Sequence, residues 1–147
     1  MRTGTGIFTD EPGLGVSRKM RKALIVDDEK KIRKIYKRFL TEEKFEVLEA
    51  ENGEQASLML VLQRDIALIL LDIRMPVVDG TALFDIIKLQ SPGAKVIVAS
   101  VYPVDDQRRV ITDADGYFDK SEGIDILLMR IKKVLSHTNG AGEEEDL

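Results

Sequence analysis

The sequence predicts a doubly wound α/β fold, in which helices cover both faces of a five-stranded parallel sheet. Short runs of apolar residues alternate with segments of helical periodicity five times along the chain. Three of these runs are apolar at every position, which is typical of strands buried on both faces of a parallel sheet. The same three runs stop at a polar residue, and doubly wound sheets bind polar ligands at the carboxyl ends of their strands.

Five strands are expected. The three apolar runs are residues 23–26, 66–71 and 96–99. Weaker signals at residues 45–49 and 117–118 predict the other two strands.

Five helices are expected between and after the strands, at residues 29–42, 54–63, 81–90, 105–112 and 124–135. In the first of them, Ile32, Ile35 and Phe39 mark one apolar face at helical spacing. The same helix carries six cationic side chains: Lys30, Lys31, Arg33, Lys34, Lys37 and Arg38. They form either a solvated face or a docking surface for a partner.

Composition limits the class of protein. The chain has 147 residues, 22 Lys and Arg against 26 Asp and Glu, and no cysteine. This length fits one domain, and the lack of cysteine excludes disulfides, thiolate metal sites and a cysteine nucleophile. A net charge of −4 argues against a direct DNA binder. No run of residues is apolar enough to predict a membrane span or a secretory signal, so we expect a cytoplasmic protein.

The two ends differ from the body. Residues 1–20 lack helical or strand periodicity and are expected to be a flexible N-terminal extension. Residues 138–147 contain the acidic run Glu143, Glu144, Glu145 and Asp146 and are expected to be a flexible acidic tail. The domain itself is placed at residues 21–137. The sequence leaves open whether Met1 or Met20 is the initiator.

The ends of the predicted strands carry a cluster of charged and polar residues: Asp27, Asp28, Asp72, Ser100 and Lys120. Three carboxylates at one edge would repel one another unless a cation lay between them, and hard oxygen ligands suit Mg²⁺. A lysine and a hydroxyl beside a cation favour phosphorus chemistry, because they would neutralise or bond phosphoryl oxygens. Read singly, each aspartate could instead cap a helix or close a turn. Lys120 could be a solvated lysine and Ser100 a satisfied hydroxyl.

These residues lie in motifs that resemble the receiver domain of two-component response regulators. The motifs are V-D-D-E at residues 26–29, L-L-D-I-R-M-P-V-V-D-G at 70–80, Ser100, and G-Y-F-D-K at 116–120. The resemblance runs from about residue 21 to residue 137. It implies the flavodoxin-like receiver fold, which agrees with the doubly wound sheet expected from the residues.

The resemblance also implies a role for each residue. Asp72 matches the phospho-accepting aspartate, Asp28 the direct ligand of Mg²⁺ (or Mn²⁺), and Asp27 the residue that holds the water shell of the cation. The backbone carbonyl of Arg74 matches a further metal ligand beside Asp72. Three residues match the phosphoryl-binding and switch positions: Lys120, the hydroxyl of Ser100, and Tyr117, whose ring is expected to turn inward on activation.

The function implied is that of a single-domain response regulator. Asp72 would accept a phosphoryl group from a histidine kinase or a histidine phosphotransfer protein, and the change would alter a surface recognised by a downstream protein target. The residues outside 21–137 are too few for an output domain. No direct DNA binding and no membrane contact are expected. A phosphorylation-dependent homodimer is left open.

Several positions depart from the family pattern. Ser121 follows Lys120, where a proline in a cis peptide is common, so the geometry of that loop is in doubt. Val101 follows Ser100, where alanine or glycine is usual. Val101, together with Arg74 and Tyr102 at positions that tune dephosphorylation, predicts slow autodephosphorylation.

Two alternatives stay open at this point. The first is a pseudo-receiver, an interaction module that is never phosphorylated. The second is a phosphatase with an aspartyl nucleophile. Such hydrolases usually have a second aspartate two residues after the nucleophile, and here that position is Arg74.

Overall fold

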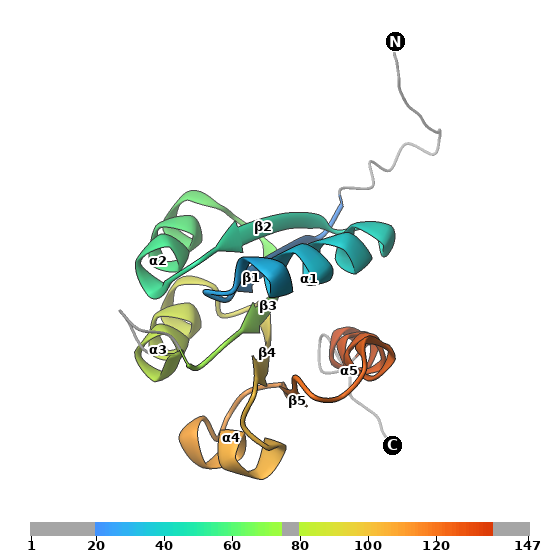
Figure 1. The fold of residues 1–147 in the computed structure, drawn as a ribbon. Helices are drawn as coiled ribbons and strands as arrows, with labels where there is room; N and C mark the ends of the chain where they lie inside the picture. Colours follow the sequence, from blue (N-terminus) through green and yellow to red (C-terminus); the bar gives the residue numbers. More distant parts are fainter. Residues whose placement is uncertain (1–19, 75–79, 137–147) are drawn as a thin grey trace, which may run out of the picture.

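The computed structural model describes residues 20–74 and 80–136, and within them strands and helices alternate (Figure 1). The strands are β1 (Lys22–Val26), β2 (Glu46–Ala50), β3 (Ile66–Leu71), β4 (Lys95–Ser100) and β5 (Gly116–Asp119). The helices are α1 (Lys30–Glu42), α2 (Gly53–Leu62), α3 (Gly80–Gln90), α4 (Val104–Val110) and α5 (Ile124–Ser136). The predicted elements are all present, in the predicted order.

The strands form one parallel sheet in the order β2-β1-β3-β4-β5. β2 therefore lies on one side of β1, and the chain then crosses back so that β3, β4 and β5 are added on the other side. Because the connections between parallel strands keep one hand, this reversal places helices on opposite faces. Helices α1 and α5 cover one face, and α2, α3 and α4 cover the other (Figure 1). The predicted doubly wound fold is confirmed.

The strand β3 explains why the central runs are apolar at every position. Ile69 and Leu71 pack in the core beneath α2 and α3, whereas Leu68 and Leu70 pack in the core beneath α1 and α5. These side chains are at most 1% exposed. A strand with a core on each face is apolar along its whole length, and β3 ends at Leu71, directly before Asp72.

The predicted boundaries differ from the structure by at most two residues, and two of the differences have a cause in the packing. Phe45 precedes β2 rather than opening it, and its buried side chain packs under α1 and α5. Helix α4 spans seven residues and ends at Val110, two residues before the predicted end. Ile111 leaves the helix with extended backbone and is buried in the core, so tertiary packing ends α4 early.

Several predicted features lie outside the described residues. They include Met75, Pro76 and Asp79 of the motif after β3 and most of the expected extension and tail, so the domain boundaries stay a prediction. Among the residues that the structure describes, no helix is long and apolar enough to cross a membrane.

Gly80 marks a close approach between the start of α3 and the segment after β3. A Cβ atom at this position would lie 2.4 Å from the Cα atom of Ile73, a backbone atom that cannot move aside alone. Glycine is therefore the residue that lets α3 begin directly against Ile73.

We expect Gly80→Ala to lower the free energy of unfolding by about 1–3 kcal/mol, because the added methyl group overpacks this contact. Urea denaturation measures the change. Gly93→Ala is the matched control, since a Cβ atom there meets nothing within 4 Å. Equal stability of the two variants would contradict the steric argument.

Candidate functional site

Backbone hydrogen bonds fix two aspartates at the carboxyl edge of the sheet. The N–H of Asp27 donates to the carbonyl of Ala50 (3.1 Å), and the N–H of Asp72 donates to the carbonyl of Val26 (2.9 Å). Each bond continues the strand ladder one residue beyond β1 or β3. Asp27 and Asp72 are therefore held side by side, and they are 1% and 4% exposed.

Each of these carboxylates also closes a turn. Oδ1 of Asp27 accepts from the N–H of Glu29 (2.9 Å), and Oδ1 of Asp72 accepts from the N–H of Arg74 (2.9 Å). The turn role that the sequence left open is thus present at both positions. It occupies one oxygen of each carboxylate, and the Oδ2 atoms remain for other partners.

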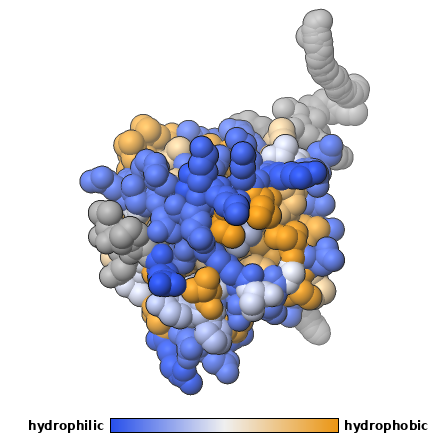
Figure 2. All heavy atoms as spheres, in the orientation of Figure 1, coloured by the Kyte–Doolittle hydropathy of each residue, from blue (hydrophilic) through white to orange (hydrophobic). Residues whose placement is uncertain are grey.

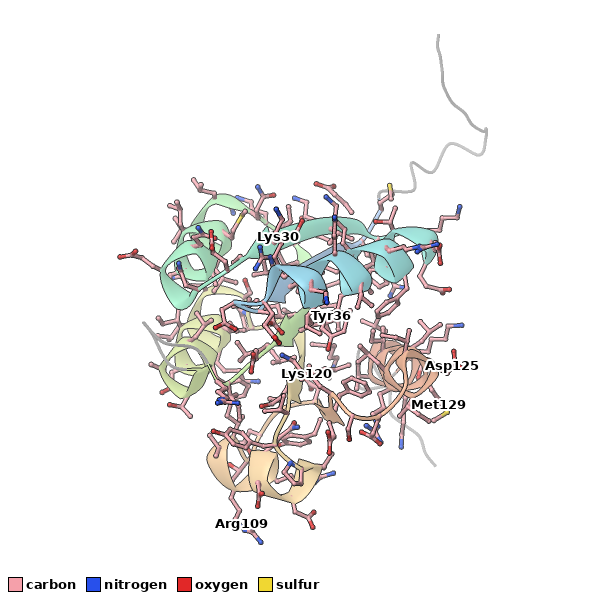
Figure 3. The ribbon with its side chains drawn as sticks, viewed as in Figure 1. Lys30, Tyr36, Arg109, Lys120, Asp125 and Met129 are labelled. Atoms are coloured by element: carbon pink, nitrogen blue, oxygen red, sulfur yellow. The ribbon has the colours of Figure 1, made fainter. Side chains whose placement is uncertain are left out.

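Lys120 supplies positive charge to the Oδ2 atoms. Its Nζ atom lies 2.7 Å from Oδ2 of Asp27 and 3.1 Å from Oδ2 of Asp72, and its side chain is 8% exposed. The lysine follows β5, and its N–H donates to the carbonyl of Ser100 (2.8 Å), which fixes the start of its side chain beside β4. Figure 3 shows Lys120 beside Tyr36 of α1. The sheet thus joins residues from three strand ends.

Burial and charge act in opposite directions on these three groups. Burial raises the pKa of Asp27 and of Asp72 above the usual range, although hydrogen bonds and the charge of Lys120 oppose the rise. Burial opposes the charge of Lys120, but its hydrogen bond to Asp27 and the two carboxylates raise its pKa well above normal. The ammonium group therefore keeps its proton, and the carboxylates are costly to ionise.

The acidic residues fit a magnesium ion. Asp27, Asp28 and Asp72 each offer a carboxylate oxygen, and these oxygens lie within 4.8 Å of one another. Oxygens in one octahedral Mg²⁺ shell lie roughly 3–4 Å apart, since each is about 2.1 Å from the ion. Asp28 is exposed, and the buried Oδ2 of Asp27 lies 2.7 Å from the ammonium group of Lys120. The site is thus open to solvent at Asp28, and the carboxylate oxygens of the buried aspartates keep lone pairs for a cation. The acidic triad is typical of a Mg²⁺ site.

The predicted switch and tuning residues occupy different environments. Ser100 is fully buried at the end of β4, and its Oγ atom accepts weakly from the N–H of Tyr102 (3.4 Å). Val101 is 50% exposed and Tyr102 is 41% exposed. Arg74 is exposed.

The ring of Tyr117 is directed into the protein and is 5% exposed. Its hydroxyl donates to the carbonyl of Ile111 (2.6 Å), and the guanidinium group of Arg108 lies 4.6 Å from the ring centre. The ring is therefore buried in this structure, and its movement on activation stays a prediction. Within the described residues no peptide bond is cis, so the bond between Lys120 and Ser121 is trans.

The sequence analysis missed two residues of this region. Arg33 donates to the carbonyl of Asp27 (2.8 Å) and pairs with Glu49 (3.1 Å), so it braces β1 against β2 instead of joining the solvated cations of α1. Glu29 lies 3.6 Å from Nζ of Lys120. Arg33 is one helical turn from Glu29, on the side of α1 that faces the strand ends. That spacing was the available signal for Arg33.

Comparison with known proteins agrees with the fold and the site. Residues 23–132 match the model of the response regulator receiver domain. The transcriptional regulatory protein SrrA of Staphylococcus aureus is 33% identical over 125 residues, which are 83% of this chain and 51% of SrrA. The chain thus spans about half the length of the curated relatives that it matches.

Solved structures give the same result. The response regulator TrrA of Thermotoga maritima, solved in complex with Mg(2+)-BeF, is 35% identical with a TM-score of 0.70, covering 78% of this chain and 99% of TrrA. A CheY-like receiver domain protein of Methanospirillum hungatei is 28% identical with a TM-score of 0.77, covering 84% of this chain and all of that one.

The chain belongs to the response regulator receiver domain family. Receiver domains are phospho-accepting signalling modules of two-component systems, phosphorylated by histidine kinases, and are not classical enzymes.

We expect Asp72→Asn to raise the free energy of unfolding at pH 7, without divalent cations, by on the order of 1 kcal/mol. The folded protein raises the pKa of Asp72, so its contribution to stability is full below the unfolded pKa and is lost as the pH rises through the folded pKa. The asparagine side chain of the variant does not ionise, so the variant does not lose this stability as the pH rises. Urea denaturation across a pH series measures the effect, which should vanish in acid.

Asp125→Asn is the control for this experiment, because Asp125 is exposed on α5, away from the site (Figure 3). A destabilised Asp72→Asn variant at pH 7 would mean that Lys120 outweighs the burial of the carboxylate.

Proposed function

We propose that this protein accepts a phosphoryl group on Asp72 from a histidine kinase or a histidine phosphotransfer protein, and that the modification switches a surface recognised by another protein. The observation that carries the proposal is that the ammonium group of Lys120 pairs with two buried carboxylates, those of Asp72 and Asp27. A buried carboxylate beside a fixed cation and an acidic pair is arranged to receive a group with several negative oxygens.

The transfer would proceed by in-line displacement. A carboxylate oxygen of Asp72 attacks phosphorus, the bond from phosphorus to the histidine nitrogen breaks, and the electron pair of that bond stays on the imidazole. Lys120 lies 3.1 Å from Oδ2 of Asp72, within reach of an oxygen of the incoming group. The N–H of Arg74 orients the carboxylate through Oδ1 (2.9 Å). Asp27, Asp28, Asp72 and the carbonyl of Arg74 would hold Mg²⁺, and the bound ion would neutralise the phosphoryl oxygens further.

The buried hydroxyl of Ser100 supports a switching role. Among the described residues, the hydroxyl has one weak bond, from the N–H of Tyr102 at 3.4 Å, so turning the hydroxyl toward a phosphoryl oxygen costs little. The aromatic partner in the switch would be Tyr117, which is already packed inward against Ile111. Added charge at Asp72 would then bias the equilibrium between two arrangements of the segments after β4 and β5.

Helix α1 supports a docking role for the partner. Lys30, Lys31, Lys34, Lys37 and Arg38 are exposed, and Figure 2 shows hydrophilic side chains over this helix. Lys30 and Lys31 lie at the helix N-terminus, where positive charge opposes the helix dipole. A cationic surface beside the acidic edge would attract an acidic partner.

The same proposal includes a stand-alone module of residues 21–137 that acts in the cytoplasm.

Intact mass spectrometry after incubation with Mg²⁺ and acetyl phosphate, or with a phosphorylated kinase, tests the function. We expect a single phosphoryl adduct on the wild-type protein and none on Asp72→Asn, because the amide is not a nucleophile toward phosphorus. Asp125→Asn should behave as wild type. No adduct on the wild type from any donor would favour the pseudo-receiver, and repeated turnover of a phosphoester would favour the phosphatase.

We expect Val101→Ala to shorten the lifetime of phosphorylated Asp72 several-fold. Val101 follows the buried Ser100 and is half-exposed, and we expect its branched side chain to hinder water that approaches a phosphoryl group on Asp72. The decay of the adduct after removal of the donor gives the lifetime. An unchanged lifetime would remove the steric explanation for slow autodephosphorylation.

A further inference from the structure

The residue of α4 that is fully buried has a polar side chain. Gln107 is the buried residue of this helix, and its side chain is fully inaccessible to solvent. Its neighbours Arg108 and Arg109 lie on the exposed part of the same helix, and Figure 3 shows Arg109 pointing away from the protein. A short amphipathic helix would ordinarily bury an aliphatic residue at this position.

The amide nitrogen of Gln107 faces backbone carbonyls from two separate segments. Nε2 donates to the carbonyl of Tyr102 (2.7 Å) and to the carbonyl of Phe118 (2.9 Å), and it lies 3.4 Å from the carbonyl of Ser100. Ser100 and Tyr102 belong to the connection from β4 to α4. Phe118 lies in β5, two residues before Lys120. One side chain therefore joins the segment of the switch hydroxyl to the strand that carries the lysine.

The other end of the amide is buried without a partner. Oε1 of Gln107 accepts no hydrogen bond from any residue in the described parts of the chain. The opposite orientation of the amide would place this oxygen against three carbonyl oxygens, so the assignment of Nε2 is secure. A buried acceptor without a donor costs free energy. The bonds donated by Nε2 offset that cost, which indicates that the contact with the two segments is what the side chain contributes.

We propose that Gln107 is a positioning residue for phosphoryl acceptance. It holds residues 100–102 against β5 and so fixes the hydroxyl of Ser100 and the ammonium group of Lys120 relative to Asp72. This inference rests on the proposed function. Gln107 touches neither the acidic triad nor the phosphoryl group. It acts through backbone that also carries the bond from the N–H of Lys120 to the carbonyl of Ser100 (2.8 Å).

The rate of transfer depends on how accurately Lys120 and Ser100 are placed relative to each other. Oxygens of the transferring group must meet Lys120 and Ser100 together, and those residues lie on different strands. A misplacement of about 1 Å in groups of this kind costs up to about a hundredfold in rate. The acidic triad lies at the ends of β1 and β3, and none of the hydrogen bonds of Gln107 goes to it. A substitution of Gln107 should therefore slow phosphoryl transfer without changing metal binding.

The test is Gln107→Met, which keeps the length of the side chain and removes the donors. Phosphorylation by acetyl phosphate is followed by intact mass at several donor concentrations. We expect the limiting rate to fall about tenfold or more, with a smaller change in the half-saturating donor concentration. The affinity for Mg²⁺ should stay within about twofold of wild type. Arg109→Met is the matched control, because the side chain of Arg109 is 75% exposed on the same helix.

Two further variants separate positioning from loss of stability. Ile131→Val removes one methylene group from the core beneath α5 and reports what general destabilisation does to the rate. Gln107→Asn retains the amide one methylene short of the carbonyls, and we expect a loss in the same direction even if the Met variant does not fold. A folded Gln107→Met variant with the rate of wild type, or a loss matched by Ile131→Val, would overturn the inference. A wild type without an Asp72 adduct would overturn the proposed function and this inference together.

Discussion

The ion pairs of Lys120 with Asp27 and Asp72 are the interaction on which the site depends. Each carboxylate is nearly inaccessible to solvent, and burial of a carboxylate raises its pKa and opposes its charge. A single ammonium group within 3.1 Å of both keeps negative charge in a buried place. The same arrangement leaves the site short of positive charge, which is the condition for attracting a divalent cation.

The topology of the sheet makes this interaction available. The order β2-β1-β3-β4-β5 places β1 directly beside β3, so that Asp27 and Asp72 follow neighbouring strands. Lys120 follows the edge strand β5, and its long side chain spans the remaining distance. The two cores on the faces of the sheet hold these strands, and the charged site lies where the apolar cover ends.

Much of the fold could be predicted because β1, β3 and β4 have a core on both faces. Continuous apolar runs such as residues 66–71 follow from that burial, and the acidic or polar residue after each run marks the carboxyl edge of the sheet. The spacing of Arg33 from Glu29 indicated the side of α1 on which it lies, but its bond to the carbonyl of Asp27 depends on how α1 packs. Gln107 resembled a surface residue in a short polar segment. Only the packing of α4 against β4 and β5 buries it.

The sequence by itself determined the order of the elements, the residues at the strand ends and the chemical character of the site, because these depend on local patterns of apolar and charged residues. The tertiary structure decided which oxygens remain available, how Lys120 is shared, and which polar side chains brace the backbone around it. Those features depend on distances in space between segments that are far apart in the chain, such as Asp72 and Lys120, which are separated by 48 positions in the sequence. Such distances are set by the packing of helices on the sheet, which no local pattern contains.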